Sequence, residues 1–523
     1  MKAKRKSTWL KNRGYLHLTK QIDVSKERGE ILGKVKNKDY VAKHAFFPLI
    51  HTKIKVRRYK QAEKAKKRSH SYEGKPHAKF RPLHYATHVD SMIFGYYGEQ
   101  LQIAYLKELD KTEHLSKCVT AYRRIVDPAK KDTYKSTIHF AHEVFEEIKL
   151  RSEDGCWVLK FDIEKFFSSM DHRLLKQAWA KLIDNPTLPK DHYNVFKAAT
   201  KFSYILRDDL RIRSSQNGRK SGFDEKNLAE IRKENTSAFF KDAKSLRAVI
   251  NAGKLRIYKN EFKNSECEMI GIPQGLPISA TLANLYLLEF DKAVLTEIVN
   301  KQGGYYRRYS DDIIVICKGE DKDAIIDFID RVLRINNKVE ISKEKTEQYY
   351  FSAIAKAEGT NKIICHLLRG EDLLPERPLT YLGFEFYGHK TLIKSANLSK
   401  FYRRMIIAVK SRSRRSILAG NKTPGASIAL FRRRLYRLYT NINLDKTTIK
   451  NRYKYLTPNR FGFYVYQTEE SEDEFRSNYF TYGRRAADIM NEPKIVDQVK
   501  RHRTIFNQAM KKHLALSIER FQK

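Results

Sequence analysis

The sequence predicts an α+β protein with an antiparallel sheet that carries acidic residues. Apolar residues at 305–306 and 313–316 flank Tyr309–Asp312, which is the pattern of a strand, a tight turn and a second strand. The apolar run 157–161 indicates a buried strand that ends at Asp162. Residues 281–291 have apolar side chains at three- and four-residue steps, which predicts a helix.

The two adjacent carboxylates in the acidic turn, Asp311 and Asp312, are the first candidate site. Like charges side by side repel each other, so such a pair is typical of a site that holds a cation. The alternative is ordinary hairpin chemistry, because Ser and Asp both favour turns. The turn alone does not decide between these two interpretations.

Asp162 is the second candidate, since it follows a separate predicted strand. A two-metal site for phosphoryl transfer takes carboxylates from separate segments, which hold two ions roughly 3.5–4 Å apart. Mg²⁺ prefers oxygen ligands and keeps several waters, so two or three carboxylates and substrate phosphates suffice. The alternative is that Asp162 caps the helix predicted after it.

Between these acids, Gly271–Ala280 forms a loop rich in Gly and Pro that leads into the helix predicted at 281–291. Such a loop lets backbone N–H groups approach a phosphate or a base closely. A plain loop-to-helix connection is the alternative for this segment taken alone.

The order of these segments resembles the successive palm motifs of reverse transcriptases. Asp162, the Gly271–Ala280 loop and the acidic turn are followed by Lys343–Thr346 and Leu379–Phe386. Upstream, Lys79–Asp90 and Ala121–Arg124 resemble the fingers segments of that family, so the resemblance covers roughly residues 75–390. Tyr122-Arg123, Ser310 and Ser279-Ala280 are most similar to abortive-infection and defence-associated bacterial members.

The resemblance implies a metal site and a nucleotide site. Asp162, the adjacent Ile163, Asp311 and Asp312 would hold two Mg²⁺ ions, with Mn²⁺ as the alternative metal. Asp162, Asp311, Asp312 and Lys345 would be catalytic, Lys345 as the acid for pyrophosphate departure. A single solvated lysine is the other interpretation of Lys345.

Further roles follow from the same resemblance. Phe167 would exclude a ribose 2′-OH, although a core aromatic is the alternative. Gln274 and Gly275 would line the nascent base pair. Lys79, Arg81 and Arg123 would meet the incoming triphosphate. Tyr381, Leu382 and Gly383 would grip the primer end.

The implied architecture is a right-hand polymerase with fingers, an antiparallel palm and a thumb, and with helical N- and C-terminal extensions. Residues 1–40 would be an N-terminal extension and 41–154 the fingers, predicted as mostly helical. Residues 155–390 would be the palm, with a basic, loop-like insertion at about 201–260. Residues 391–523 would be a helical thumb and C-terminal extension.

Composition indicates a polyanionic partner. The formal net charge is +42, from 103 basic and 61 acidic residues, and 30 Tyr and 28 Phe are interleaved with the bases. A basic structural protein would share this charge but not the ordered acidic motifs. The five cysteines have no paired spacing, and no signal peptide or membrane span is predicted, so we expect a cytoplasmic protein.

The predicted function is RNA-directed DNA synthesis in bacterial antiviral defence. The expected partners are a noncoding RNA as template or scaffold, dNTPs and the DNA product, and self-association through the extensions is a further hypothesis. One alternative is template-independent or protein-primed synthesis by the same site. Another is an RNA-binding scaffold without turnover, and an RNA-dependent RNA polymerase is disfavoured by Phe167.

Overall fold

In the computed structural model of the chain, strands and helices form two compact units. The described residues are 9–57, 60–61, 68–69, 71–72, 75–76, 78–212, 222–234, 236–355, 361–420, 433–441, 448–458, 464–474 and 478–521. The first unit comprises residues 1–123 and 159–346, and the second comprises residues 124–158 and 347–523. Neither unit is one continuous stretch of chain.

The first unit contains the acidic turn, the Gly/Pro loop and the end of the strand that carries Asp162. Its helices are α1 (Arg28–Lys36), α2 (Lys38–Lys43), α3 (His88–Asp110), α4 (Leu115–Cys118), α6 (Phe166–Ser169), α7 (His172–Leu182), α8 (Lys190–Thr200), α9 (Glu225–Lys233), α10 (Ala243–Asn251), α11 (Ser279–Tyr286), α12 (Leu288–Val294) and α13 (Lys322–Arg331). The π-helical turns η2 (Leu295–Lys301) and η3 (Val332–Asn336) extend α12 and α13, and η1 (Arg207–Leu210) and η4 (Lys343–Lys345) are 3₁₀ turns.

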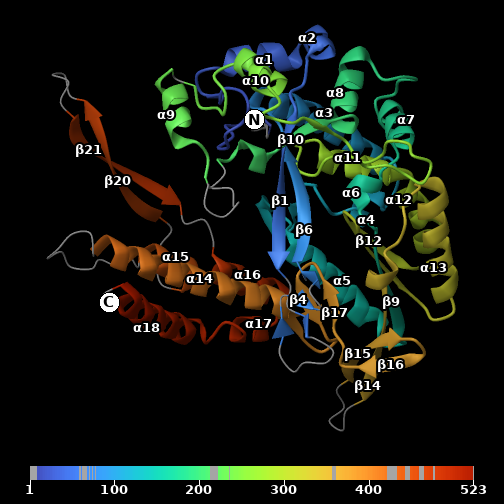
Figure 1. Cartoon of the computed structure of the whole chain (residues 1–523). Helices are drawn as coiled ribbons and strands as arrows, with labels where there is room; N and C mark the ends of the chain where they lie inside the picture. Colours follow the sequence, from blue (N-terminus) through green and yellow to red (C-terminus); the bar gives the residue numbers. More distant parts are fainter. Residues whose placement is uncertain are drawn as a thin grey trace. The chain divides into compact units, whose positions relative to one another are not determined.

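The strands of the first unit lie in two main groups. β1 (Leu49–Arg57) and β6 (Ala78–Tyr85) run side by side as a long antiparallel pair (Figure 1). β10 (Ser203–Leu206) pairs with β1 in parallel, and β11 (Tyr258–Lys259) completes this four-stranded sheet. In the other group, β12 (Tyr305–Tyr309) pairs with β13 (Asp312–Cys317), which neighbours β9 (Cys156–Asp162). The short pairs β2 (Lys60–Gln61) with β3 (Arg68–Ser69) and β4 (Ser71–Tyr72) with β5 (Lys75–Pro76) lie between β1 and β6 in sequence.

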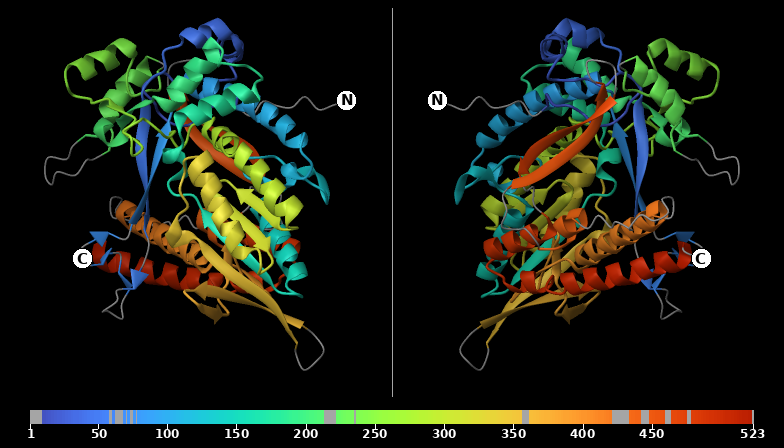
Figure 2. Two further views of the ribbon diagram at one scale, coloured as in Figure 1. Left: turned by 90° about the vertical axis from the view of Figure 1, so that its right-hand side faces the viewer. Right: turned by 90° about the vertical axis from the view of Figure 1, so that its left-hand side faces the viewer.

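The second unit begins with a short antiparallel pair of strands and ends with helices. It holds β7 (Val126–Asp127), β8 (Lys130–Tyr134), α5 (Thr137–Arg151), the first half of β9, β14 (Glu347–Ala355), β15 (Asn361–Arg369), β16 (Asp372–Pro375), β17 (Leu379–Tyr381), β18 (Phe384–Phe386), β19 (Thr391–Ile393), α14 (Ser395–Gly420), α15 (Arg433–Tyr439), β20 (Thr448–Pro458), β21 (Tyr464–Glu474), α16 (Tyr479–Met490), α17 (Lys494–Asp497) and α18 (His502–Phe521). The order β9-β14-β15-β16 makes one antiparallel layer beyond β14, and β17-β18-β19 make a second small sheet. Helices α14 and α18 lie alongside each other in both views of Figure 2.

The stretch predicted as a loop-like insertion at about 201–260 contains regular structure. It supplies β10, α9, α10 and β11, and its Ile205, Leu228 and Leu246 are buried with Leu18 and Ile50 in one apolar cluster. Residues 213–221 and 235 lie outside the described residues. The sequence signal that was overlooked is the apolar spacing of Leu228 and Ile231, which gives α9 one buried face.

Two further predictions of secondary structure need correction. The fingers range 41–154 contains the long helices α3 and α5, but also the β1–β6 pair, so it is not mostly helical at its start. The C-terminal range 391–523 contains the antiparallel β20–β21 pair as well as its helices. The β-branched and aromatic residues within 448–457 were the available sign of a strand. In the described ranges, no helix combines the length and the apolar character that crossing a membrane requires.

Candidate active site

The acidic turn connects two buried strands and holds its residues in a fixed conformation. In the β12–β13 register Tyr309 pairs with Asp312, which leaves Ser310 and Asp311 as a two-residue turn. Ser310 has a φ of 63°, the left-handed conformation that such tight hairpins use. The side chains of residues 313–316 are fully buried. Because consecutive residues of β13 are buried, both faces of the strand are packed, and this packing fixes where the carboxylates stand.

Asp162, the last residue of β9, lies next to the acidic turn. The backbone N–H of Ile163 donates to the Asp311 carbonyl at 3.4 Å, and Ser342 N–H donates to the Asp162 carbonyl at 2.8 Å. The carboxylate of Asp162 forms an ion pair with the ammonium group of Lys345. Lys345, the predicted acid, therefore lies next to the predicted metal ligands Asp162, Ile163 and Asp311. These residues come from three separate segments of the chain.

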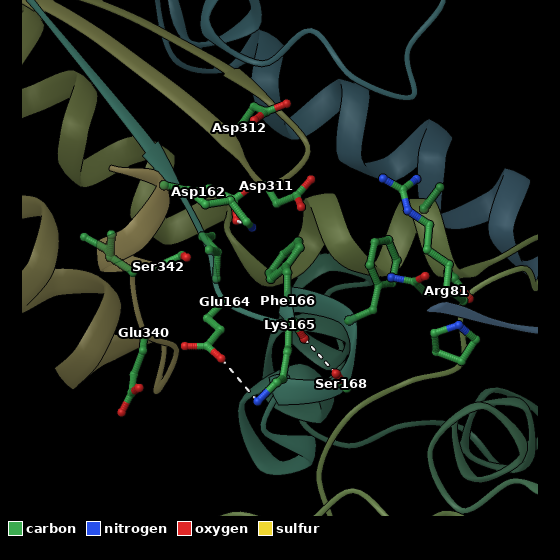
Figure 3. A pocket seen from close by; sticks show the side chains of 18 of the residues that line it. Arg81, Asp162, Glu164, Lys165, Phe166, Ser168, Asp311, Asp312, Glu340 and Ser342 are labelled. Atoms are coloured by element: carbon green, nitrogen blue, oxygen red, sulfur yellow. Dashed lines mark hydrogen bonds and ion pairs between the residues drawn. The ribbon is translucent and has the colours of Figure 1, made fainter. Parts of the chain in front are cut away.

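These segments line a cavity of about 1080 Å³ (Figure 3). Asp162 and Asp311 lie next to each other in this view, and Arg81 lies across the pocket from them. The lining residues are Phe80–Pro82, Tyr122, Asp162–Ser168, Gln274–Leu276, Ser279, Ala280, Asp311, Asp312, Glu340–Lys343 and Lys345. The cavity thus combines carboxylates at one place with basic side chains elsewhere on its wall, as binding a metal-bound triphosphate requires.

Burial and mutual repulsion make the two turn carboxylates hard to ionise in the metal-free chain. Burial raises the pKa of Asp312 to about 6, and the neighbouring Asp311 carboxylate adds to this rise. Burial also raises the pKa of Asp311, with a further contribution from Asp162, while Lys345 opposes the rise. A cation would remove both costs, because it replaces lost hydration and screens the repulsion.

The donor set fits a divalent metal that is completed by substrate. Among the described residues, no three His, Cys, Asp or Glu side chains form a ready-made metal cluster, and the Asp162 carboxylate is engaged by Lys345. Mg²⁺ is commonly held by one or two carboxylates together with substrate phosphates and waters. Asp311 and Asp312, with Asp162 after exchange from Lys345, are the residues that would hold it. Ile163 lines the cavity, and only its backbone is available as a ligand.

A glycine in the Gly/Pro loop packs directly against the β6 backbone. Gly275 has a φ of 112°, and a Cβ built there would lie 2.5 Å from the His84 carbonyl oxygen. The backbone N–H of His84 donates to the Gln274 carbonyl at 2.8 Å. This close approach places Gln274 and Gly275 on the cavity wall, where both were expected, and only glycine fits there.

Other predicted residues differ in their placement. Arg81 and Phe167 line the cavity. The Arg123 guanidinium instead donates to the carbonyls of Ser116 and Val119 and to the Ser116 hydroxyl, so it closes the end of α4 and does not line the cavity. Its predicted contact with the triphosphate has no support in this arrangement, because these hydrogen bonds engage both terminal nitrogens of the guanidinium.

The predicted roles of Lys79 and of the turn at residues 381–383 stay predictions. Lys79 lies in β6, but its side chain is outside what the structure describes. Tyr381, Leu382 and Gly383 form the turn between β17 and β18 in the second unit, with a φ of 42° at Leu382 and 95° at Gly383. Their role as a primer grip stays a prediction.

The sequence reasoning missed part of the cavity wall. Glu340, Ser342 and Lys343 line it because their segment pairs with the chain after β9, through Glu164 N–H to the Glu340 carbonyl at 2.8 Å. Tyr122 also lines the cavity, whereas its neighbour Arg123, which the sequence predicts as a triphosphate contact, does not. The proximity of 340–343 to Lys345 in sequence was the only available signal for the first group.

The raised pKa of Asp312 leads to a prediction about pH. A carboxyl whose folded pKa lies above its ordinary value favours the fold below that ordinary value, and this contribution disappears as the pH rises through about 6. In EDTA, Asp312→Asn should therefore match the parent protein near pH 4. Above pH 6.5 it should be more stable by about 3 kcal/mol, because the pKa of Asp312 rises from 3.8 to about 6. Chemical denaturation at each pH measures this difference, and a difference independent of pH would contradict the assignment.

Part of the chain matches the model of a known protein family. Residues 219–386 match the family model described as reverse transcriptase (RNA-dependent DNA polymerase). The matched range includes the Gly/Pro loop, the acidic turn and Lys345, but not Asp162. The chain therefore contains a reverse transcriptase domain within these residues. No curated protein matches the chain.

Solved telomerase structures are among those that resemble the chain. Apo telomerase from Candida tropicalis, truncated from its C-terminal domain, matches with a TM-score of 0.35 and 11% identity over 61% of this chain and 54% of that one. Telomerase from Candida albicans with the TWJ fragment of telomeric RNA matches with a TM-score of 0.34 and 10% identity, over 72% and 52% of the two chains. The chain spans about half the length of these structures.

Proposed function

We propose that this protein is a metal-dependent RNA-directed DNA polymerase that adds dNTPs to a 3′-hydroxyl. The observation that carries the proposal is the meeting of Asp162, Asp311 and Asp312 in one cavity, from the strand and the turn that the sequence singled out. A scaffold that only bound RNA would not need three carboxylates placed together at this cost in burial.

The residues of the cavity divide the work between them. Bound divalent ions would supply activation of the attacking hydroxyl and neutralisation of the triphosphate charge. Asp162, Asp311 and Asp312 would hold these ions, and the exposed Arg81 would contact the triphosphate. Lys345, now paired with Asp162, would be freed once that carboxylate has a cation, and it could then give a proton to the departing pyrophosphate.

The finer parts of the proposal rest on resemblance and charge. A bacterial defence role and a noncoding RNA partner are supported by the sequence segments that resemble abortive-infection members of the family. The net charge of +42 supports a nucleic-acid partner. We keep the division into fingers at 41–154, palm at 155–390 and thumb at 391–523, the cytoplasmic location and self-association as parts of this proposal.

The test is DNA synthesis by purified protein with its co-purified nucleic acid. Each labelled dNTP is supplied with Mg²⁺, with and without earlier RNase treatment. Product that depends on RNA and on Asp311 and Asp312 supports templated synthesis. Product that survives RNase and stays bound to the protein would favour protein-primed or untemplated synthesis, and bound RNA without product would favour the scaffold.

Replacement of Phe167 should relax the choice of sugar. Phe167 lies in α6 at the cavity wall, and its carbonyl accepts a hydrogen bond from Ile272 N–H at 2.7 Å, so the backbone that carries the ring is fixed. We expect Phe167→Ala to raise the efficiency of rNTP use relative to dNTP use by about 10- to 100-fold. Single-nucleotide incorporation measures kcat/KM for each. Phe328→Ala on α13, a matched loss of an aromatic ring, should leave the ratio unchanged, and an unchanged ratio in Phe167→Ala would remove this residue from sugar selection.

A further inference from the structure

Two residues in left-handed backbone conformation, Tyr122 and Ser310, contact each other at the acidic turn. Tyr122 has a φ of 60° and Ser310 a φ of 63°, and the Tyr122 hydroxyl lies 3.1 Å from the Ser310 hydroxyl. Tyr122 is 46% exposed and lines the cavity, whereas Ser310 is buried directly before Asp311. Left-handed residues other than glycine are strained and persist only where their surroundings hold them.

A buried guanidinium holds the Ser310 side of this contact. Arg308 is fully buried and makes a two-point ion pair with Asp291, from Nε to Oδ1 at 2.7 Å and from Nη2 to Oδ2 at 2.5 Å. Its remaining nitrogen, Nη1, donates to the Ser310 carbonyl at 3.1 Å and to Asn284 Oδ1 at 3.2 Å. The forked pairing fixes the direction of the guanidinium, so Ser310 is held at both its carbonyl and its hydroxyl.

The same network holds the Tyr122 side. Asn284 Nδ2 donates to the Ala121 carbonyl at 3.0 Å. Thr120 donates to the Arg308 carbonyl with its backbone N–H at 3.0 Å and with its hydroxyl at 3.1 Å. Asn284 itself lies on α11, which begins at Ser279 in the cavity wall. Three segments that line the cavity are therefore tied to one buried guanidinium.

We propose that the Tyr122–Ser310 hydroxyl pair, seated on the network of Arg308, Asp291 and Asn284, is the positioning element for Asp311. The Tyr122 ring is exposed to whatever occupies the cavity, and its hydroxyl contacts the residue that precedes the catalytic carboxylate. The pair thus holds the turn in the conformation that binds metal, before and during catalysis. This inference rests on the proposed polymerase function.

A double-mutant cycle at the rim of the cavity tests the pair without disturbing the buried network. Tyr122→Phe, Ser310→Ala and the double variant each remove one or both hydroxyls. We expect Tyr122→Phe to lower kcat about fivefold and Ser310→Ala to lower it at least as much, since the Ser310 hydroxyl also hydrogen-bonds Asp311. The double variant should lower kcat no further than Ser310→Ala, since both lack the Tyr122–Ser310 hydrogen bond. KM for dNTP should stay within about twofold, and half-maximal activity should need more Mg²⁺. Tyr193→Phe, at another exposed tyrosine, should change none of these values.

A second measurement does not depend on activity. Mg²⁺ should raise the melting temperature of the parent protein, and the raise at a fixed Mg²⁺ concentration should be smaller in Tyr122→Phe and Ser310→Ala. The inference is overturned if the two kcat losses multiply, if KM changes in place of kcat, or if the Mg²⁺ response is that of the parent. A parent protein that makes no DNA would instead refute the proposed function, and the melting experiment would still test the pair.

Discussion

Asp311→Asn is expected to abolish DNA synthesis while leaving the metal-free fold at least as stable as before. The amide keeps the size of the side chain but loses the charge that holds a cation, so we expect kcat to fall by about 10³-fold or more. Burial and the nearby Asp162 make ionisation of Asp311 unfavourable, so the neutral amide should also raise the melting temperature in EDTA at pH 7.5. The two effects have opposite signs, which separates lost chemistry from lost structure.

The measurement is single-nucleotide incorporation together with thermal unfolding with and without Mg²⁺. Asp327→Asn on the exposed face of α13 is the matched control, and it should alter neither value. The stabilisation by Mg²⁺ should disappear in Asp311→Asn and persist in the control. Retained synthesis in Asp311→Asn would contradict the assignment of this carboxylate, and a lower melting temperature in EDTA would contradict the cost assigned to its charge.

Gly275→Ala is expected to have the second largest effect, through the backbone. A methyl group at this position would meet the His84 carbonyl oxygen at 2.5 Å, and the φ of 112° is strained for any residue with a Cβ. Because the obstructing atom belongs to the backbone of β6, the loop must move away from the strand. We expect a loss of about 2–4 kcal/mol in the free energy of unfolding and a fall of about 100-fold in kcat/KM as Gln274 leaves its place.

The control for this substitution is Gly33→Ala. Gly33 is exposed in α1, and a Cβ there would meet nothing within 4 Å, so alanine should leave activity unchanged and add about 0.5–1 kcal/mol of stability. Denaturant unfolding and dNTP titration measure both variants. Normal stability and KM in Gly275→Ala would show that the loop does not need its close approach to β6.

Local patterns predicted the strand and the hairpin that carry the candidate carboxylates, because each depends on a short stretch of chain. The apolar run before Asp162 and the turn at Ser310-Asp311 form the expected strand end and hairpin, and burial of the strands fixes both. Arg123 was assigned to the triphosphate because its residue type suits phosphate, whereas in the structure it binds carbonyls at the end of a short helix. No local pattern indicates that contact.

The sequence analysis did not predict the strands and helices within 201–260, for a related reason. Its apolar residues become a core only when Leu18 and Ile50 arrive from distant parts of the chain. The segment 340–343 likewise joins the cavity wall through pairing with residues after β9. Such long-range pairings depend on the whole fold and not on the composition of either segment.

The discontinuous units have a consequence for synthesis on the ribosome. All the described cavity residues lie in the first unit, which is complete once residue 346 has emerged. Helix α5 belongs to the second unit, and its Phe145 stacks on Phe386 with ring centroids 4.5 Å apart, a partner made about 240 residues later. Until residue 386 has been made, Phe145 lacks this partner. The nascent chain then has a complete first unit and an incomplete second one, and this is the period in which we expect it to depend most on chaperones.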